Sequence, residues 1–470
     1  MLDPRHASLS EAARALAAGE VSSEELTRDC LERAHRLNAT LNCFVRIDEA
    51  GALEAATLAD RVRARGKRLG PLHGVPVALK DMFYRPGRET GSGSRLRQGH
   101  RGAAEASVLR RLRAAGAVSL GELNMTEFAL GPTGHNELHG PCRNPWNPAH
   151  IAGGSSSGSG AALAARIAFG TLGSDTAGSI RGPACANGVL GLKPTYGRVS
   201  RAGAMRLSWS MDHVGPLART AEDLARLLAV IAGPDPQDPT ASAHAVPDYP
   251  ARLGAGVRGL RIGVPENFFF EELDPAVGTL IEAALAELER QGARRVAVTV
   301  PDAGQLTELG RTLMYSEATA LHGHFLRTRP EEYSAQVRAR AATGIAIPAA
   351  AYLEALQLRA PVLRRFVEAV FSRCELLATP TLALAVPTLA ATDVRGGPQM
   401  WHTIARLVRC VAPFSYLGVP ALNVPVGFTA DGLPAGLQLV GRPFAEPRLL
   451  AAAAAYQAAT DWHTRLPPVS

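Results

Sequence analysis

Segments with the pattern of buried β-strands alternate with segments with the pattern of helices along most of this 470-residue sequence. The apolar run HGVPVALKD (73–81) ends in a polar pair, which is typical of a buried strand that delivers a polar side chain at its carboxyl end. Residues 104–117 have a helical pattern, and AVSLGELNM (117–125) has strand character again. This alternation predicts an α/β fold.

We expect a single domain over residues 1–470, although the length would also allow two or three domains. The best candidate for a boundary is GPDPQDPTASAHAVPDYP (233–250), which is rich in Pro, Asp and Ser. Strand-like segments of similar character lie on both sides of it. We therefore predict that residues 233–258 form an exposed loop within one domain.

Helices are predicted most clearly in two parts of the chain. The sequences SLSE (8–11) and SSEE (22–25) both fit a capping box, so residues 1–70 are expected to contain N-terminal helices. Residues 305–373 are also largely helical in pattern.

The composition argues against several classes of protein. With 46% hydrophobic and 20% charged residues, the chain has ample material for a core. The net charge of +7 comes from arginines scattered among acidic residues, and only 5% of residues are aromatic, so no patch typical of nucleic-acid binding is recognisable. Six widely spaced cysteines without a C-x-x-C pair indicate neither zinc nor disulfides, and we expect no metal and no cofactor. No apolar run approaches the ~18 residues that span a bilayer, and the N-terminus is not that of a signal peptide, so we expect a cytoplasmic protein.

The stretch GGSSSGS (153–159) admits three local interpretations. A flexible linker would be the default for this composition, but the stretch continues directly into Ala-rich helical sequence, which places it at a helix N-terminus. A phosphate-binding P-loop needs Lys and Ser/Thr after its last glycine, whereas Ser159 and Gly160 follow here. The nucleophile elbow G-x-S-x-G is matched formally at Ser156, but RNPWNPAHIA (143–152) before it is not an apolar strand.

A family resemblance explains the stretch better. The run GGSSSGSGAALAARIAFGTLGSDTAGSIRGP (153–183) resembles the amidase signature, in which a Gly/Ser loop, a helix and an acidic G-S-I-R-x-P turn occur at fixed spacing. Other segments resemble the same family in the same order: GVPVALKD (74–81), AGAVSLGELNMTEFALG (115–131), GPCRNPWNP (140–148), GLKPTYGRVSRAG (191–203), DHVGPLARTAEDLA (212–225) and GVPALNVPVGF (418–428). The resemblance covers nearly the whole chain, and an ordered set of motifs is far more specific than one motif.

The resemblance implies the details of the fold and the division of the chain. It implies a central mixed, mostly parallel twisted sheet covered by helices on both faces. Residues 71–230 would form the signature core, and residues 300–420 would form the variable region of the substrate pocket.

The resemblance also implies a catalytic trio of two serines and a lysine. Ser179 in GSIR matches the nucleophile, Ser155 in GGSS the bridging serine in a cis peptide, and Lys80 in ALKD the general base. A serine hydroxyl needs a neighbouring base, and a lysine can act as one only if its amine is neutral at about pH 7. Burial at the end of the apolar run VPVAL would lower the pKa of Lys80, and Ser155 would pass the proton between Lys80 and Ser179.

Backbone N–H groups are expected to stabilise the oxyanion. The turn Thr176, Ala177, Gly178 and Ser179 offers a set of such donors. Family members often have glycine where this chain has Ala177, and the extra methyl group is expected to restrict the turn or to narrow the pocket slightly.

Other residues near these motifs are expected in contact or supporting roles. Asn124, Met125 and Gly154 are candidates for binding the substrate. Asp175 and Arg181 are expected to form a buried pair that holds the loop.

Three functions are compatible with these residues. The first is a stand-alone amidase that hydrolyses a C–N bond other than a peptide bond, in an amide or a carbamate (urethane), through a Ser179 acyl-enzyme. The alternative is a glutaminase-type amidase subunit of a glutamyl-tRNA(Gln)/aspartyl-tRNA(Asn) amidotransferase. APFSY (412–416) lacks the Asn expected in that subunit, and no Arg and acidic pair for glutamine is recognisable, which favours the stand-alone enzyme. A non-catalytic scaffold ranks last because Lys80, Ser155 and Ser179 are all present.

The expected partners follow from the preferred function. The segments MYSEATALHGHFL (314–326) and AIPAAAYLEALQL (346–358) are apolar, and an apolar pocket suits an aryl or alkyl acyl group. We therefore expect a small-molecule amide or carbamate as the substrate, no nucleic acid and no membrane as a partner, and we leave a homodimer open.

Overall fold

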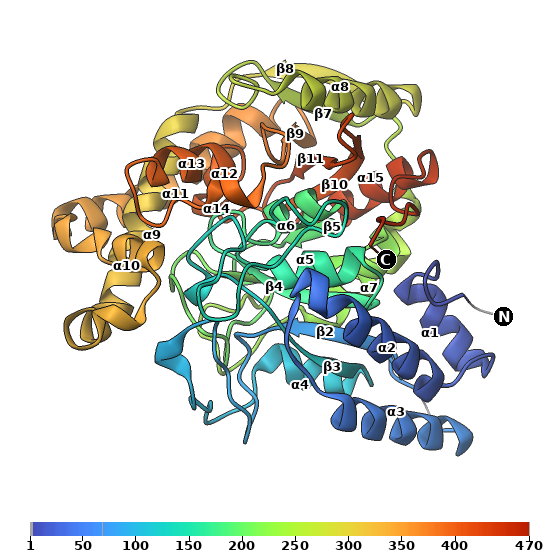
Figure 1. The fold of residues 1–470 in the computed structure, drawn as a ribbon. Coiled ribbons are helices and arrows are strands. Elements are labelled where there is room, and N and C mark those ends of the chain that lie inside the picture. The colour runs from blue at the N-terminus through green and yellow to red at the C-terminus, as the bar shows by residue number, and fades with distance from the viewer. Residues whose placement is uncertain (1–2, 68, 470) are drawn as a thin grey trace.

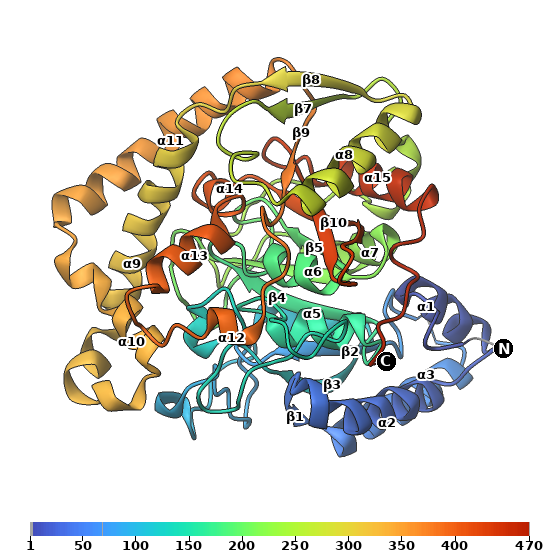
Figure 2. The ribbon, with the colours of Figure 1, turned by 45° about the horizontal axis from the view of Figure 1, so that its top comes forward.

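A mixed sheet runs through the whole molecule, and helices flank it (Figures 1 and 2). The strands are β1 (Phe44–Ile47), β2 (Pro76–Lys80), β3 (Val118–Leu123), β4 (Gly170–Asp175), β5 (Leu190–Lys193), β6 (His213–Ala218), β7 (Arg261–Pro265), β8 (Arg294–Val298), β9 (Leu376–Pro380), β10 (Ala421–Phe428) and β11 (Pro434–Val440). In the computed structural model, which describes residues 3–67 and 69–469, they form an 11-stranded sheet in the order β1-β3-β2-β4-β6-β5-β10-β11-β9-β7-β8. β1 to β6 form one side and β7 to β11 the other, and the antiparallel pair of β5 and β10 joins the two sides. The chain is therefore one large α/β domain, as predicted.

The pairing of the strands differs in one respect from the expectation. Parallel pairs occur in two groups, β2 with β3 and β4, and β7 with β8 and β9. The other pairs are antiparallel, including those of β5, β6, β10 and β11 at the centre. β10 and β11 are antiparallel because a short turn, closed by a hydrogen bond from Thr429 N to Leu433 O (2.8 Å), joins them. The sheet is thus mixed, as predicted, but less parallel than expected.

Along the chain, the helices lie before, between and after these strands. The α-helices are α1 (Leu9–Ala18), α2 (Ser23–Leu41), α3 (Glu49–Ala64), α4 (Ser107–Ala114), α5 (Ser157–Ala164), α6 (Arg181–Asn187), α7 (Ala221–Ile231), α8 (Pro275–Arg290), α9 (Ala303–Thr328), α10 (Ala335–Ala341), α11 (Ala349–Phe371), α12 (Leu389–Thr392), α13 (Met400–Val408), α14 (Ala412–Tyr416) and α15 (Glu446–Ala458). The 3-10 helices are η1 (Arg95–Arg97), η2 (Glu127–Ala129), η3 (Pro250–Ala255), η4 (Pro330–Glu332) and η5 (Thr343–Ala346).

The N-terminal helices begin where the capping boxes predict. In α1, the Ser8 side chain accepts from Glu11 N and the Glu11 carboxylate accepts from Ser8 N. Ser22 and Glu25 make the same reciprocal pair at the start of α2. Both helices, with α3, lie beside the end of the sheet that holds β1 to β3 (Figures 1 and 2).

The segment 233–258 contains one short element, η3, and many exposed residues. Two contacts fix it to the domain. The Tyr249 side chain is fully buried, and Arg198 donates from Nη1 to the carbonyl oxygens of His244 (3.0 Å) and Ala245 (3.1 Å). The segment is therefore a loop held at defined points along its length.

The helices α9, α10 and α11 extend from one flank of the sheet (Figures 1 and 2). α9 packs against α10, α11, α14 and η5. This helical unit closes one side of the site described below.

Across the described ranges, no single helix has both the length and the apolar character needed to cross a bilayer. Residues 335–346 and 349–371 meet the criteria only as a pair, and the two are bent by 92°.

Candidate active site

The site lies at the edge of the sheet where β2 and β4 end. These two strands are neighbours and parallel, so their carboxyl ends meet at the same edge. Lys80 is the last residue of β2, and Ser174 and Asp175 are the last residues of β4. The loop that carries Ser155 enters α5 beside this edge. Sequence segments almost a hundred residues apart are thereby brought into contact.

Lys80 is surrounded by serine hydroxyls. Its side chain is 1% exposed, and Nζ lies 2.7 Å from Ser155 Oγ, 3.1 Å from Ser156 Oγ and 2.9 Å from Ser174 Oγ. Among the residues that the structure describes, no carboxylate lies within 4.0 Å of Nζ. A neutral amine has two N–H donors and one lone pair, so this cage suits it when two hydroxyls accept and the third donates.

Burial shifts the ionisation of this amine. Desolvation lowers the pKa of Lys80 to about 7, although the negative charges of Asp212 and Asp175 act in the opposite direction. A substantial fraction of the amine is therefore neutral at about pH 7, which is the form that a general base needs.

The loop before α5 is rigidly placed. The Gly154–Ser155 peptide bond is cis, as the resemblance implies. A Cβ atom on Gly154 would fall 2.5 Å from Gly131 O and 2.8 Å from Thr126 Oγ1, so a larger residue does not fit. The Ser155 carbonyl accepts from Thr126 N at 3.1 Å. A flexible linker is thus excluded for this stretch.

Ser179 is the serine of the site that a substrate can reach. It is partly exposed, whereas Ser155, Ser156 and Ser174 are buried. Ser156 N donates to the Ser179 carbonyl at 3.3 Å, which ties the Ser179 turn to the loop of Ser155. This arrangement suits an attacking hydroxyl in front of a buried relay and base.

Asp175 and Arg181 hold the turn, as expected from the sequence. Both side chains are fully buried, and Arg181 donates to the Asp175 carboxylate from Nη2 (2.9 Å) and Nε (3.0 Å). The same carboxylate accepts from the N–H groups of Gly178 (2.7 Å) and Ile180 (3.2 Å). Burial alone would raise the pKa of Asp175, but the charge and hydrogen bonds of Arg181 outweigh it and hold the pKa well below its usual range.

This arrangement changes the expected set of oxyanion donors. The Gly178 N–H is occupied by Asp175, so it is not free for an oxyanion in this structure. Across the described part of the chain, no acceptor is found for the N–H groups of Thr176, Ala177 and Ser179. Gly178 has φ +123°, and a Cβ atom there would fall 2.3 Å from Val411 Cγ2, so the turn requires glycine at this position.

Asp212 is a supporting residue that the sequence reasoning missed. Its Oδ1 accepts from Thr176 Oγ1 at 2.6 Å, and its Oδ2 accepts from the N–H groups of Leu207 (2.9 Å) and Ser208 (3.0 Å). Burial raises the pKa of this carboxyl despite those hydrogen bonds. The only signal was its place at the start of DHVGPLARTAEDLA, where no role could be assigned to it.

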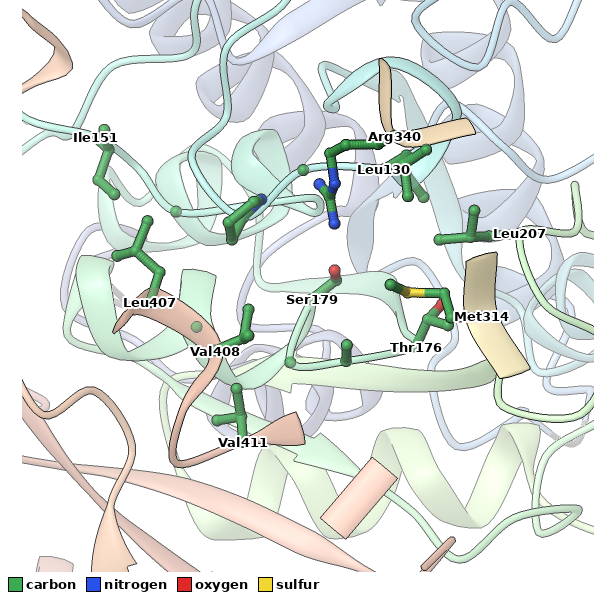
Figure 3. A pocket seen from close by; sticks show the side chains of 18 of the residues that line it. Leu130, Ile151, Thr176, Ser179, Leu207, Met314, Arg340, Leu407, Val408 and Val411 are labelled. Atoms are coloured by element: carbon green, nitrogen blue, oxygen red, sulfur yellow. The ribbon is translucent and has the colours of Figure 1, made fainter. Parts of the chain in front are cut away.

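Ser179 faces a mostly apolar cavity (Figure 3). Its wall includes Gly154, one of the three predicted substrate-binding residues. The large apolar side chains of the lining are those of Leu130, Ile151, Leu207, Met314, Leu382, Leu407, Val408 and Val411. Arg340 is the charged residue of this wall, and the sequence reasoning missed it as well.

Asn124 and Met125 do not line the cavity. The Asn124 side chain donates to the carbonyl oxygens of Asn42 (2.9 Å) and Gly140 (3.2 Å), and the Met125 side chain is fully buried. The structure therefore places both behind the loop, where they support it. Their order in the sequence, close after β3, could not show on which side of the loop they lie.

No metal centre is evident at the site: within residues 3–67 and 69–469, no group of three or more His, Cys, Asp or Glu side chains is arranged to hold an ion.

Comparison with known proteins gives the family. A family model described as Amidase matches residues 25–450. A glutamyl-tRNA(Gln) amidotransferase subunit from Chloroflexus aggregans is 40% identical over 494 residues, which cover 100% of both chains. A solved "vestigial protein complex", described as revealing the origins of an s-triazine catabolic enzyme, has a TM-score of 0.90 and 36% identity over 96% of this chain and 98% of its own. A peptide amidase from Stenotrophomonas maltophilia has a TM-score of 0.85 and 34% identity over 98% of both chains. This chain belongs to the amidase family, and it is a hydrolase of C–N bonds.

These relatives correct the expected partners. We expected a small-molecule substrate and no nucleic acid, but curated relatives with 38–41% identity are named as one of the subunits of an amidotransferase of glutamyl-tRNA(Gln). The expectation was wrong because composition reports only on the surface of one chain. One member of a complex can serve a tRNA-dependent enzyme without a basic, aromatic patch of its own.

The buried amine predicts how activity depends on pH. If neutral Lys80 is the base, kcat/KM for an amide will rise as the pH increases through about 7 and will level off above it, because the amine loses its proton over that range. A pH profile of kcat/KM measures this.

Asp81 provides the control for this profile. Burial raises the pKa of its carboxyl to about 7, so it titrates in the same range. Asp81→Asn removes that titration and should keep the rise. A profile that becomes flat in Asp81→Asn would assign the rise to Asp81 and contradict the role of Lys80.

The contact between Thr176 and Asp212 predicts a positioning effect. Thr176→Val keeps the shape of the side chain but removes the hydroxyl that holds the turn. It should lower kcat by about 10- to 100-fold, the range for a lost hydrogen bond to a charged group. Thr176→Ser should keep most of the activity. Equal kcat values for the two variants, with melting temperatures near that of the wild type, would show that this contact has no effect on catalysis.

Proposed function

We propose that this chain is the amidase subunit of a glutamine-dependent amidotransferase, which hydrolyses the side-chain amide of glutamine and supplies ammonia to a partner that holds glutamyl-tRNA. The full-length similarity to the Chloroflexus aggregans protein carries the proposal. The contact of Lys80 with Ser155 and the place of Ser179 in the cavity wall support it, because such an enzyme needs a base and an accessible nucleophile for acyl transfer.

The contact of Lys80 with Ser155 supports the following course of the reaction. The neutral amine of Lys80 takes the proton of Ser155, which at the same time takes the proton of Ser179. Ser179 Oγ attacks the amide carbon, and the C–N bond breaks as the proton returns through Ser155 to the leaving nitrogen. Ammonia leaves, and water then attacks the acyl-enzyme by the same proton route and releases glutamate.

The oxyanion of each tetrahedral intermediate lies against the turn after β4. The N–H groups of Thr176, Ala177 and Ser179 are the donors available for it. One such preorganised donor contributes about 10²- to 10³-fold to kcat in related chemistry. The buried pair of Asp175 and Arg181 fixes these groups before the substrate arrives, so no reorganisation is needed during the reaction.

One argument against the amidotransferase is weakened by the structure. The sequence offered no recognisable Arg and acidic pair for glutamine; the described cavity wall contains an arginine, Arg340, but no acidic residue. APFSY (412–416) still lacks the Asn that is expected in the amidotransferase subunit. These residues form α14, which is fully buried behind the site.

A stand-alone amidase is the second candidate. The similarity to the peptide amidase and the apolar side chains around Ser179 favour it. The same acyl-enzyme chemistry would serve an aryl amide or a carbamate.

A substrate panel distinguishes the two candidates. The chain is purified alone and together with the proteins that accompany it in its own cells, and release of ammonia or amine is measured for glutamine, a C-terminal peptide amide and an aryl carbamate. We expect glutamine to have the highest kcat/KM, with the larger rate in the accompanied form. Ser179→Ala should lower kcat by at least about 10³-fold, because the nucleophile is lost.

Two results would contradict the proposal. A higher kcat/KM for the peptide amide or the carbamate with the isolated chain would establish the stand-alone enzyme. Retention of the glutamine activity by Ser179→Ala would remove the proposed nucleophile.

A further inference from the structure

Two buried basic residues, Lys193 and His213, lie beside the turn that carries Ser179 and have no part in the proposed reaction. Lys193 is the last residue of β5 and His213 the first residue of β6, and their exposed fractions are 0% and 2%. β6 pairs antiparallel with both β4 and β5, and His213 is the register partner of Asp175 at the end of β4. The sheet therefore brings both residues to the start of the turn.

The imidazole of His213 holds a backbone carbonyl. Its Nδ1 lies 3.0 Å from the carbonyl oxygen of Asp175. A carbonyl oxygen can only accept, so Nδ1 carries the proton in this contact. Burial and then the nearby amine of Lys193 lower the pKa of His213 well below its usual value, so the ring is neutral. The other ring nitrogen, Nε2, is therefore an acceptor.

Lys193 supplies the donor for Nε2. Its Nζ lies 3.4 Å from His213 Nε2, and it also donates to the carbonyl oxygens of Pro194 (3.3 Å) and Val419. A protonated amine has one N–H group for each of these three acceptors, and a neutral amine still has two. Because Nε2 has no proton, the amine can only donate to it in either state. This contact fixes the tautomer of the imidazole.

The carbonyl held by His213 belongs to the first peptide of the turn. The same peptide carries the N–H group of Thr176, one of the proposed oxyanion donors. This peptide is trans, so its C=O and N–H groups point in opposite directions. The N–H group of Thr176 is thus directed away from His213, and Thr176 lines the cavity over Ser179.

A hydrogen bond to a peptide carbonyl affects the N–H group of the same peptide in two ways. It fixes the plane of the peptide, and it polarises the amide so that the N–H group becomes a stronger donor. The second effect matters most when negative charge develops in front of that N–H group. Arg181 does not replace this contact, because it holds the side chain of Asp175 and not the carbonyl.

We infer that His213 is a positioning residue for the oxyanion site. Lys193 fixes its tautomer, and its Nδ1–H group holds the peptide between Asp175 and Thr176 so that the N–H group of Thr176 faces the oxyanion. The inference deepens the proposed function, because it rests on oxyanion formation at Ser179, but it does not depend on glutamine as the substrate.

The test measures kcat and KM for the amide with the highest kcat/KM in the substrate panel above. His213→Leu removes both ring nitrogens. It should lower kcat by about 10- to 100-fold and leave KM within about twofold of the wild type, because the oxyanion exists only after the attack. His213→Gln offers an N–H group to the carbonyl and an oxygen to the amine, so it should keep at least about a third of kcat. If His213→Leu does not fold, His213→Asn takes its place with the same expectation, because its shorter side chain does not reach both partners.

A double-mutant cycle tests the part of Lys193. Lys193→Met removes the donor to Nε2 and should lower kcat by about 3- to 10-fold. In the His213→Leu background the same change should have no further effect on kcat, because the amine acts through the imidazole. Effects on kcat that multiply would overturn the part assigned to Lys193.

Inhibition separates a positioning role from a purely structural one. The aldehyde that corresponds to the amide forms a tetrahedral adduct with Ser179 and places its oxygen at the oxyanion position, whereas the carboxylic acid product does not. In His213→Leu the Ki of the aldehyde should rise by the factor by which kcat falls, and the Ki of the acid should stay at the wild-type value. Equal rises of both Ki values would show a structural role and overturn the inference.

A second histidine provides the matched control. His73 Nε2 lies 2.9 Å from the carbonyl oxygen of Ala59, and His73 precedes β2 at the end opposite Lys80. His73→Leu loses the same kind of contact and should leave kcat and both Ki values unchanged. Activity retained by Ser179→Ala would refute the mechanism at Ser179. Loss of activity in Ser179→Ala together with a wild-type kcat in His213→Leu would refute this inference alone.

Discussion

The proposed chemistry of this protein depends on the burial of one amine. The parallel pairing of β2 with β4 places Lys80 in a cage of three serine hydroxyls, where its side chain is buried. Removal from water, rather than a neighbouring charge, brings its pKa to about 7. If the same lysine lay at an exposed strand end, it would keep its proton and could not serve as a base. In the proposed mechanism, burial at this edge of the sheet is therefore what lets Lys80 act as a base.

Two buried carboxylates near the site hold its backbone, and their environments differ. Asp175 is paired with Arg181, which keeps it ionised and balances its charge. Asp212 has only neutral donors at hydrogen-bond distance, and burial raises its pKa. Neither carboxylate contacts the amine of Lys80, so their attraction for its proton is weaker than the effect of burial. The same two groups thus fix the turn around Ser179 without restoring the charge of the base.

The sequence was sufficient for the parts of the site that depend on local motifs. The capping boxes of α1 and α2 and the helix after the Gly/Ser loop follow from short segments of sequence. The contact of Lys80 with Ser155 was expected only from the family resemblance. The antiparallel pairing at the centre of the sheet could not be predicted from the sequence. The direction of a strand depends on how the chain connects it to its neighbours, and the residue pattern of the strand does not show this. Asp212 and Arg340 were missed for a related reason. Nothing in the segment RARAAT distinguishes a buried arginine from the many exposed ones, and only the packing of α10 against α9 shows the difference.

Reaction and recognition therefore come from different parts of the fold. The proposed base, relay and nucleophile lie at the end of β2, in the loop before α5 and in the turn between β4 and α6. Met314, Arg340 and Leu407 come from α9, α10 and α13, which extend from one flank of the sheet and contact the reacting groups only across the cavity (Figures 2 and 3). A substitution on these helices changes the shape or charge of the cavity without disturbing the cage around Lys80. This separation gives a physical reason why proteins that share 34–40% identity with this chain over nearly its whole length can be named for such different amides.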